Sequence, residues 1–297
     1  MPQPAIANDL RNNSDQLVEI AVAGVISPPT FRRPGYIPDN DGLARLLPGM
    51  SGMVYNVRVG DPAFFWEGDH VEPGASIDHP DSGIHHALHY LNCIGNRVLV
   101  TSGDAAGTEG IITGEHARLL ADFDPDMHAL LCVGDSIQIR SCGHGLKLLD
   151  YPHIELKKFS PELLRALPLE PVNDRCLRVP VAMELPVSIM ASGAELNAEY
   201  VDQDLASGDR TLMAELGIDQ LRLGDLVAIR HSDHHYGRGY RKDYVAIGLC
   251  IHGDSVMTGH GPGILTLMAA KADALEWQID PKANIANYLG IRPELFA

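Results

Sequence analysis

Alternating and continuous apolar runs along the chain predict a protein built mainly from β-strands. Strands are expected at residues 17–26, 53–60 and 96–104, where β-branched residues concentrate and Gly or Pro closes the run. Apolar residues recur at helical spacing in residues 84–91, which predicts a helix packed on a sheet. Between residues 109 and 140, a Gly-Asp turn and alternating runs predict hairpins rather than βαβ units.

The second half repeats this pattern. Strands are predicted at residues 179–190, 221–230, 243–254 and 261–270, with a helix at 211–218. Prolines concentrate in the preceding linker around one short helix, residues 160–167, with Ser160 as N-cap and Pro161 in its first position. We therefore place an N-terminal strand-rich lobe at 1–165 and a C-terminal one at 166–297, packed together closely enough to count as one domain.

Residues 130–140 and 221–230 share a Gly-Asp turn followed by alternating apolar residues. The two lobes could therefore be pseudo-related halves, or the pattern could be a common way to begin a strand. The 29 Gly and 20 Pro residues exceed what a helical bundle tolerates, because Gly costs about 1 kcal/mol and Pro about 3 kcal/mol inside a helix. The expected fold class is α+β, mainly β, with barrel or sandwich lobes and a few short helices.

Charge and composition restrict the classes of molecule that we expect the protein to bind. The formal net charge of −16 opposes nucleic acid and anionic membranes, which bind basic surfaces. No run approaches the roughly 20 apolar residues of a membrane helix, and residues 1–16 lack signal-peptide features, so we expect a cytoplasmic protein. The five scattered cysteines predict free thiols. A small-molecule substrate is the expected ligand, and strand edges favour a homo-oligomer.

Fourteen histidines are the compositional oddity, and several lie in glycine-flanked turns. The densest polar segment is His231–Tyr244, which is either a ligand-binding hairpin loop or a solvated hairpin tip. The next strand ends at His252, and three glycines surround His260, which lets backbone N–H groups and the imidazole approach a ligand. Alternatively, His260 hydrogen-bonds a carbonyl in a tight turn.

The first half offers similar turns at Asp69-His70, at Asp104 and at His116. Imidazoles and carboxylates together can bind a divalent metal. The HExxH, GxSxG, GxGxxG and GK[ST] motifs do not occur, so the zincin, serine-hydrolase and nucleotide-binding interpretations lack support. Cys142 lies two residues from His144, but a buried structural thiol is favoured over a nucleophile pair.

Longer stretches of the chain resemble an uncharacterised prokaryotic group, domain-of-unknown-function family 4438. They are LPGMSGMVYNVRVGD, WEGDHVEPGASI, CIGNRVLVTSGDAAGTEGIITGEH, VGDSIQIRSCGHGLKLLDYP, LGDLVAIRHSD and IHGDSVMTGHGPGI. The resemblance implies no reaction, although a metal-binding role has been suggested for a member. The positions matching the family pattern are Asp69, His70, Asp104, His116, Asp233, His252 and His260. His144 departs from that pattern, which puts a catalytic role for it in doubt.

Three functions stay open. The first is a metal-dependent hydrolase acting on a small amide, cyclic amide or similar C–N bond, and it has a loose likeness to acetamidase/formamidase proteins. The second is a non-catalytic small-ligand-binding protein with Arg238 and Arg241 as anion partners. The third is a metal-free isomerase or lyase with His252 or His260 as general base.

Under the hydrolase hypothesis each candidate residue has a role. The predicted cofactor is a divalent metal (Zn, Mn or Fe), and the motifs at His70, Asp233 and His252/His260 must converge in space. The predicted metal ligands are His70, Asp69, Asp233 and His260. The predicted catalytic residues are His252, His260, Asp104 and His116, and the predicted substrate-binding residues are Arg238, Ser255 and Gly261.

Overall fold

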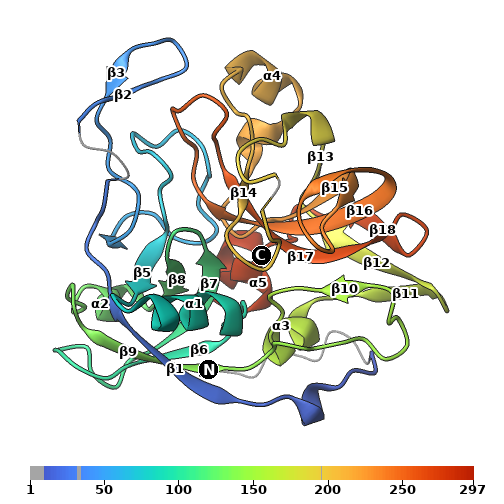
Figure 1. Ribbon diagram of the computed structural model, residues 1–297, viewed down its shortest axis with the longest axis horizontal. Helices are drawn as coiled ribbons and strands as arrows, with labels where there is room; N and C mark the ends of the chain where they lie inside the picture. Colours follow the sequence, from blue (N-terminus) through green and yellow to red (C-terminus); the bar gives the residue numbers. More distant parts are fainter. Residues whose placement is uncertain (1–9, 32–34, 195) are drawn as a thin grey trace.

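A computed structural model describes residues 10–31, 35–194 and 196–297 (Figure 1). Within these ranges strands dominate, and the helices are short, as the sequence predicted. The helices are α1 (Ser82–Leu91), α2 (Pro125–His128), α3 (Pro161–Ala166), α4 (Arg210–Glu215) and α5 (Ile285–Tyr288). No helix in these ranges is both long and apolar enough to cross a membrane.

The first half forms a closed antiparallel barrel. Its strands are β1 (Ile20–Ile26), β5 (Gly74–Asp78), β6 (Arg97–Val100), β7 (Glu109–Glu115), β8 (Leu119–Asp122) and β9 (Ser136–Ser141). They pair in the order β1-β9-β6-β7-β8-β5, and a direct β1–β5 pairing closes the ring. The strand β4 (Met53–Val54) adds to β5. Helix α1 packs against β1 where Gly24 has no side chain, since a Cβ there would lie 3.1 Å from Leu88 Cδ1.

The second half forms an open sheet beside the barrel (Figure 1). Its strands are β13 (Met183–Leu185), β14 (Gln203–Asp204), β15 (Leu226–Asp233), β16 (Gly239–His252) and β17 (Gly263–Lys271), joined by β10 (Glu155–Leu156) from the first half. A smaller sheet contains β11 (Glu170–Asn173), β12 (Cys176–Val181) and β18 (Leu275–Ile279), and β2 (Ile37–Pro38) pairs with β3 (Ala44–Arg45). One continuous apolar core includes residues of both halves.

Strands β7 and β16 carry the closest contact between the barrel and the open sheet. A Cβ on Gly114 would lie 2.9 Å from Cβ of Ile251, so only glycine allows these two backbones to approach this far. Each strand is also irregular at this point. The β7–β8 register shifts between Ile112 and Gly114, and the β16–β17 register shifts between Cys250 and His252. Such bulges re-aim the side chains that follow them.

Several predicted elements match the structure closely. Ser160 is the N-cap of α3 and accepts a hydrogen bond from Leu163 N, with Pro161 in the first turn. The prediction for residues 53–60 was wrong beyond β4, although Val57 and Val59 are buried. That segment instead runs between the two halves: Arg58 forms an ion pair with Asp122 on β8 at 2.7 Å, and Gly60 N donates to Leu223 O of the second half at 2.7 Å.

A recurring turn explains the similarity between residues 130–140 and 221–230. At Gly134-Asp135 the glycine has φ 93°, and the Asp carboxylate accepts a hydrogen bond from the backbone N–H of Cys132 at 2.8 Å. Gly224-Asp225 has the same arrangement, with Arg222 as the donor. It recurs at Gly60-Asp61 and at Gly95-Asn96, where an asparagine oxygen accepts. The shared sequence pattern therefore encodes a local turn.

This turn yields a stability prediction at Asp135. Replacing Asp135 by Ala removes a buried acceptor from Cys132 N, which should lower the free energy of unfolding by about 1–3 kcal/mol in urea denaturation. Asp135→Asn should cost clearly less, because Asn96 shows that an amide oxygen closes the same turn. Equal losses in the two variants would contradict this interpretation.

Candidate metal centre

Four histidine imidazoles meet where the barrel and the open sheet touch. His116 follows β7 directly, His252 is the last residue of β16, His70 lies in the loop before β5, and His260 lies in the turn before β17. Ring centroids are 4.2 Å apart for His116 and His252, and 5.1 Å apart for His70 and His252. The centroids of His70 and His260 are 5.3 Å apart. Each half of the chain therefore contributes two imidazoles to one cluster.

Two aspartates complete the cluster. Asp202 precedes β14 and Asp204 ends it, and residues two apart on an extended strand point to the same side. Asp202 Oδ2 lies 2.8 Å from His252 Nε2. Asp204 Oδ1 lies 3.3 Å from the same nitrogen, while Asp204 Oδ2 lies 3.6 Å from His70 Nε2 and 3.8 Å from His260 Nε2. Asp204 thus stands between the imidazoles of both halves.

The six side chains divide into two adjoining groups. One contains His70, Asp204 and His260, and the other contains His116, Asp202 and His252. Within each group one ligand atom per residue lies within 4.8 Å of the others, which is the spacing needed to hold one metal ion. Five of the six residues are buried, and His260 is partly exposed.

Hydrogen bonds behind the imidazoles orient their rings. Nδ1 of His70 is 3.1 Å from Asp69 Oδ2, and Nδ1 of His116 is 2.8 Å from Glu72 Oε1. Backbone carbonyls take the same place behind the other two rings: Gly253 O for His252 and Thr258 O for His260. Each Nδ1 therefore donates a proton outward, and each Nε2 is left as the ligand atom, which is the usual arrangement behind metal-binding histidines.

Burial and neighbouring charges shift the pKa values of this cluster in opposite directions. Burial lowers the pKa of His252, but Asp202 and Asp204 outweigh it and raise that pKa well above its usual value. Burial likewise raises the pKa of Asp204, whereas the neighbouring imidazoles of His252 and His70 outweigh burial and lower it. The imidazoles and carboxylates thus compensate one another's charge.

Three buried polar atoms indicate what the cluster is built to hold. Within the described residues, His70 Nε2, His252 Nε2 and Asp202 Oδ2 have no hydrogen bond of good geometry; they face only one another and Asp204 across the centre of the cluster. A Cβ on Gly263 would collide with Asp202 Oδ2 and His252 Nε2, so this glycine keeps the space between them open. Unsatisfied buried donors and acceptors are costly. Nitrogen and oxygen atoms in this arrangement fit a divalent metal such as Zn, Mn or Fe.

A buried network fixes Asp202 from behind. Glu115 accepts a hydrogen bond from Val201 N at 3.1 Å, while Lys158 and His89 pair with the same carboxylate. Arg238 donates to the backbone carbonyls of Val201 and Asp202. Glu115 precedes His116, so this network ties the two segments that bear His116 and Asp202 together.

The structure brings together some of the residues predicted from the sequence. His70, His116, His252 and His260 lie in the cluster, and Asp69 orients His70 without joining either group of three. Ser255 donates to Asp69 Oδ1 at 2.7 Å, so it supports that carboxylate. Gly261 packs against Leu205 and Ser207, just beyond Asp204.

Three predicted site residues lie elsewhere. Asp104 is exposed on the turn between β6 and β7. Asp233 pairs with His235 and Arg241 near Gly239, at the far end of the 14-residue strand β16 from His252. The expected convergence of Asp233 with His70 and His252 is therefore wrong, and the form of the hydrolase hypothesis that needs Asp233 as a ligand fails; Asp202 and Asp204 are the carboxylates that lie with the histidines. Arg238 is buried and donates to backbone carbonyls, so it supports the Asp202 segment and does not present its guanidinium to a substrate.

The carboxylates of Asp202 and Asp204 were missed by the sequence analysis. Their signal is the Asp-x-Asp spacing in VDQD, which places both on one side of a strand. Glu72, two residues after His70, was missed as well. It is buried, accepts from Ser51 N at 2.8 Å and Ser76 Oγ at 2.6 Å, and holds His116. No spacing along the sequence connects Asp202 and Asp204 to the histidines, or Glu72 to His116.

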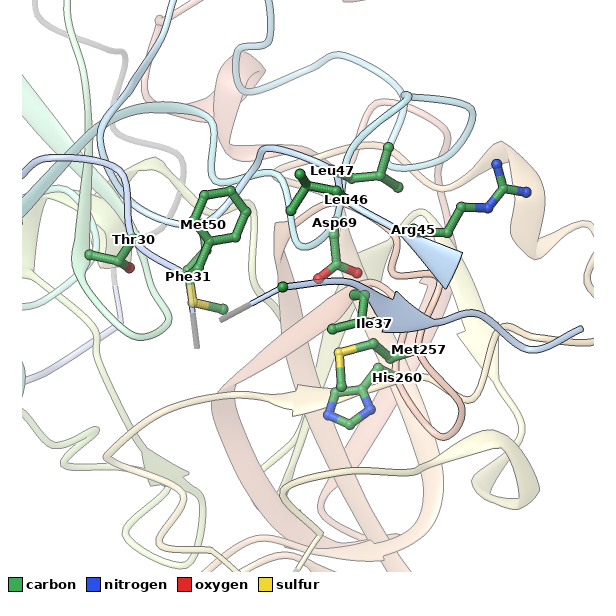
Figure 2. A pocket seen from close by; sticks show the side chains of 11 residues that line it. Thr30, Phe31, Ile37, Arg45, Leu46, Leu47, Met50, Asp69, Met257 and His260 are labelled. Atoms are coloured by element: carbon green, nitrogen blue, oxygen red, sulfur yellow. The ribbon is translucent and has the colours of Figure 1, made fainter. Parts of the chain in front are cut away.

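A pocket of about 150 Å³ opens on the exposed side of the centre (Figure 2). Asp69 and His260 are part of its lining, and the remaining lining is largely apolar. His260 is the only ligand candidate of the two groups that also lines this pocket, so a small molecule entering there reaches the His70, Asp204 and His260 group first.

Comparisons with known proteins find one family and one solved structure that match most of the chain. The family described as "Domain of unknown function (DUF4438), N-terminal" matches residues 36–165, and "Domain of unknown function (DUF4438), C-terminal" matches residues 166–289. A solved structure described as "Crystal structure of TM1086" is similar at 38% sequence identity, with a TM-score of 0.90, over 95% of this chain and 99% of that one. The comparison with curated proteins finds no match.

The hairpin that contains Asp233 yields a prediction of its own. The neighbouring His234 is buried between Ser232 and Thr266, and burial together with Arg238 lowers its pKa to about 3. Because the folded pKa lies below the unfolded value near 6.5, this stability contribution is complete above pH 6.5 and is lost as the pH falls toward 3. At pH 5 the loss should be about 2 kcal/mol.

Urea denaturation at pH 7.5 and pH 5 tests this. His234→Gln cannot be protonated, so it should show a smaller loss of stability between the two pH values than the unmodified protein. His144→Gln, on an exposed turn, is the matched control and should retain the full loss. If the His234→Gln and unmodified proteins lose the same stability, His234 does not carry the effect.

Proposed function

The chain belongs to the DUF4438 family, and we propose that it is a metal-dependent hydrolase acting on the C–N bond of a small amide or cyclic amide. One observation carries the proposal: two groups of three candidate metal ligands lie next to each other, and Asp204 lies between them. One carboxylate oxygen of Asp204 faces His252, and the other faces His70 and His260. The proposal rests on this geometry and not on the loose likeness to acetamidase/formamidase proteins.

The residues of the two groups would hold the metal. His70, Asp204 and His260 form one ligand set, and His116, Asp202 and His252 form the other. A divalent metal bound there would polarise a carbonyl oxygen and lower the pKa of a water molecule, which are the two tasks that amide hydrolysis demands. Zn, Mn and Fe all suit a mixed imidazole and carboxylate set.

The protein's own contribution is orientation and exclusion of water. Asp69 and Glu72 hold the Nδ1 protons of His70 and His116, so both Nε2 atoms keep their lone pairs toward the centre. The buried ligands are closed off from solvent, and partly exposed His260 leaves access from the pocket side. Substrate would therefore meet the centre from one direction.

Metal content tests the first part of the proposal. Protein purified without an affinity tag should contain stoichiometric divalent metal by elemental analysis, and His252→Ala should lose most of it because it removes a buried central ligand. Asp233→Asn, at the opposite end of β16, should retain the metal. No stoichiometric metal in the unmodified protein would refute the proposal.

A glycine pair provides a sharper test that removes no ligand. Gly263→Ala should reduce the metal content, because its Cβ would fill the space between Asp202 and His252. Gly239→Ala is the matched control: it also lies in the long β16–β17 sheet, but a Cβ there meets nothing within 4 Å. Equal metal content in the two variants would mean that this space does not hold a metal ion.

Catalysis is tested with a panel of small amides and cyclic amides. The metal-loaded protein should hydrolyse at least one of them, and Glu72→Gln should lower kcat/KM by about 10–100-fold, since it weakens the orientation of His116. Asp104→Asn, on an exposed turn, should leave kcat/KM unchanged. Metal binding without any turnover would instead favour the non-catalytic binding protein.

A further inference from the structure

The pocket beside the candidate metal centre has a distinctive lining. Apolar side chains dominate it, as Figure 2 shows, and they come from β2 and the segment before it, from the segment after β3 and from the turn before β17. They are Phe31, Ile37, Leu46, Leu47, Met50 and Met257. Phe31 and Leu46 are 63% and 53% exposed, so a ligand in the pocket would cover apolar surface that now faces water.

The charged residues of the pocket are already paired. Arg45 donates to Asp39 at 2.9 Å, and in Figure 2 its guanidinium extends away from the other labelled side chains. Asp69 accepts from His70, Ser255 and Val256. An ionic group on a ligand would compete with these existing pairs, and it would lose hydration on entering an apolar pocket.

The volume sets the size of the group. About 150 Å³ is enough for a benzene ring in an apolar protein cavity. Met50 and Met257 have flexible thioether side chains, which adapt to rings and branched chains alike. His260 lines the pocket and belongs to the His70, Asp204 and His260 set, so a group bound against His260 lies beside that set.

We propose that the substrate carries a neutral apolar group, of the size of a phenyl ring or a branched alkyl chain, next to the bond that is broken, and that this pocket binds it. This inference rests on the proposed hydrolase function, because it describes the substrate of that reaction. Selectivity then comes from the pocket, and the reaction comes from the centre beneath it.

Hydroxamates are suitable probes because they bind divalent metals and differ only in their substituent. On the metal-loaded protein, benzohydroxamate should bind at least about tenfold more tightly than acetohydroxamate by calorimetry, and the anionic monohydroxamate of succinate should bind no better than acetohydroxamate. Equal affinities for the aryl and methyl probes, or preference for the anionic one, would overturn the inference while leaving the metal centre intact.

Pocket-filling variants control for any difference in affinity between the two probes that does not depend on the pocket. Met257→Trp should reduce the preference for benzohydroxamate to less than about threefold, and Leu47→Trp serves as a second variant should the first fail to fold. Leu130→Trp, on an exposed position after α2, is the control and should keep the preference. An undiminished preference in both pocket variants would place the apolar group elsewhere.

A metal-independent measurement separates this inference from the proposed function. Methyl NMR of the methionines, recorded on metal-free protein during titration with benzamide, should show saturable shifts of Met50 and Met257. Saturable shifts on the metal-free protein would support the pocket even if the protein as purified contained no stoichiometric metal, which is the result that would refute the hydrolase. The absence of saturable shifts would overturn the pocket inference whatever the metal content.

Discussion

The approach of β7 to β16 at Gly114 and Ile251 is the contact on which the rest of the site depends. Any side chain at position 114 would push the barrel and the open sheet apart. Their separation would part His116 from His252, whose ring centroids are now 4.2 Å from each other. The register shifts beside this contact turn both histidines toward the same interior point.

The buried charges of the centre are tolerated because imidazoles and carboxylates compensate each other and because the four imidazoles and the Asp202 segment are held from behind. Carboxylates or carbonyls accept from the Nδ1 atoms of the four histidines, and Arg238 and Glu115 fix the backbone that carries Asp202. Such a preorganised set loses little conformational entropy on binding a metal. The same hydrogen bonds explain why polar residues outside the two ligand groups, such as Glu72, are buried.

The position of the centre also separates the two tasks that we propose, which are the reaction at the centre and substrate selection in the pocket. The ligands come from both halves of the chain, so the centre forms only when the barrel and the open sheet are packed together. The pocket is built from loops on one side and differs in character, being apolar where the centre is ionic. In the function that we propose, substrate preference therefore depends on loop residues such as Met257, which lie outside the proposed ligand set.

The sequence by itself determined the strand-rich fold class, the capped helix at Ser160 and the four histidines of the centre. These follow from local signals: periodicity, capping residues and glycine-flanked turns act over a few positions. Asp202, Asp204 and Glu72, and the exclusion of Asp233 and Asp104, were decided only by the tertiary structure. Their roles depend on which strand ends meet, and Asp233 lies on the same hairpin as His252 but at its other end. Local patterns carry no information about such long-range packing.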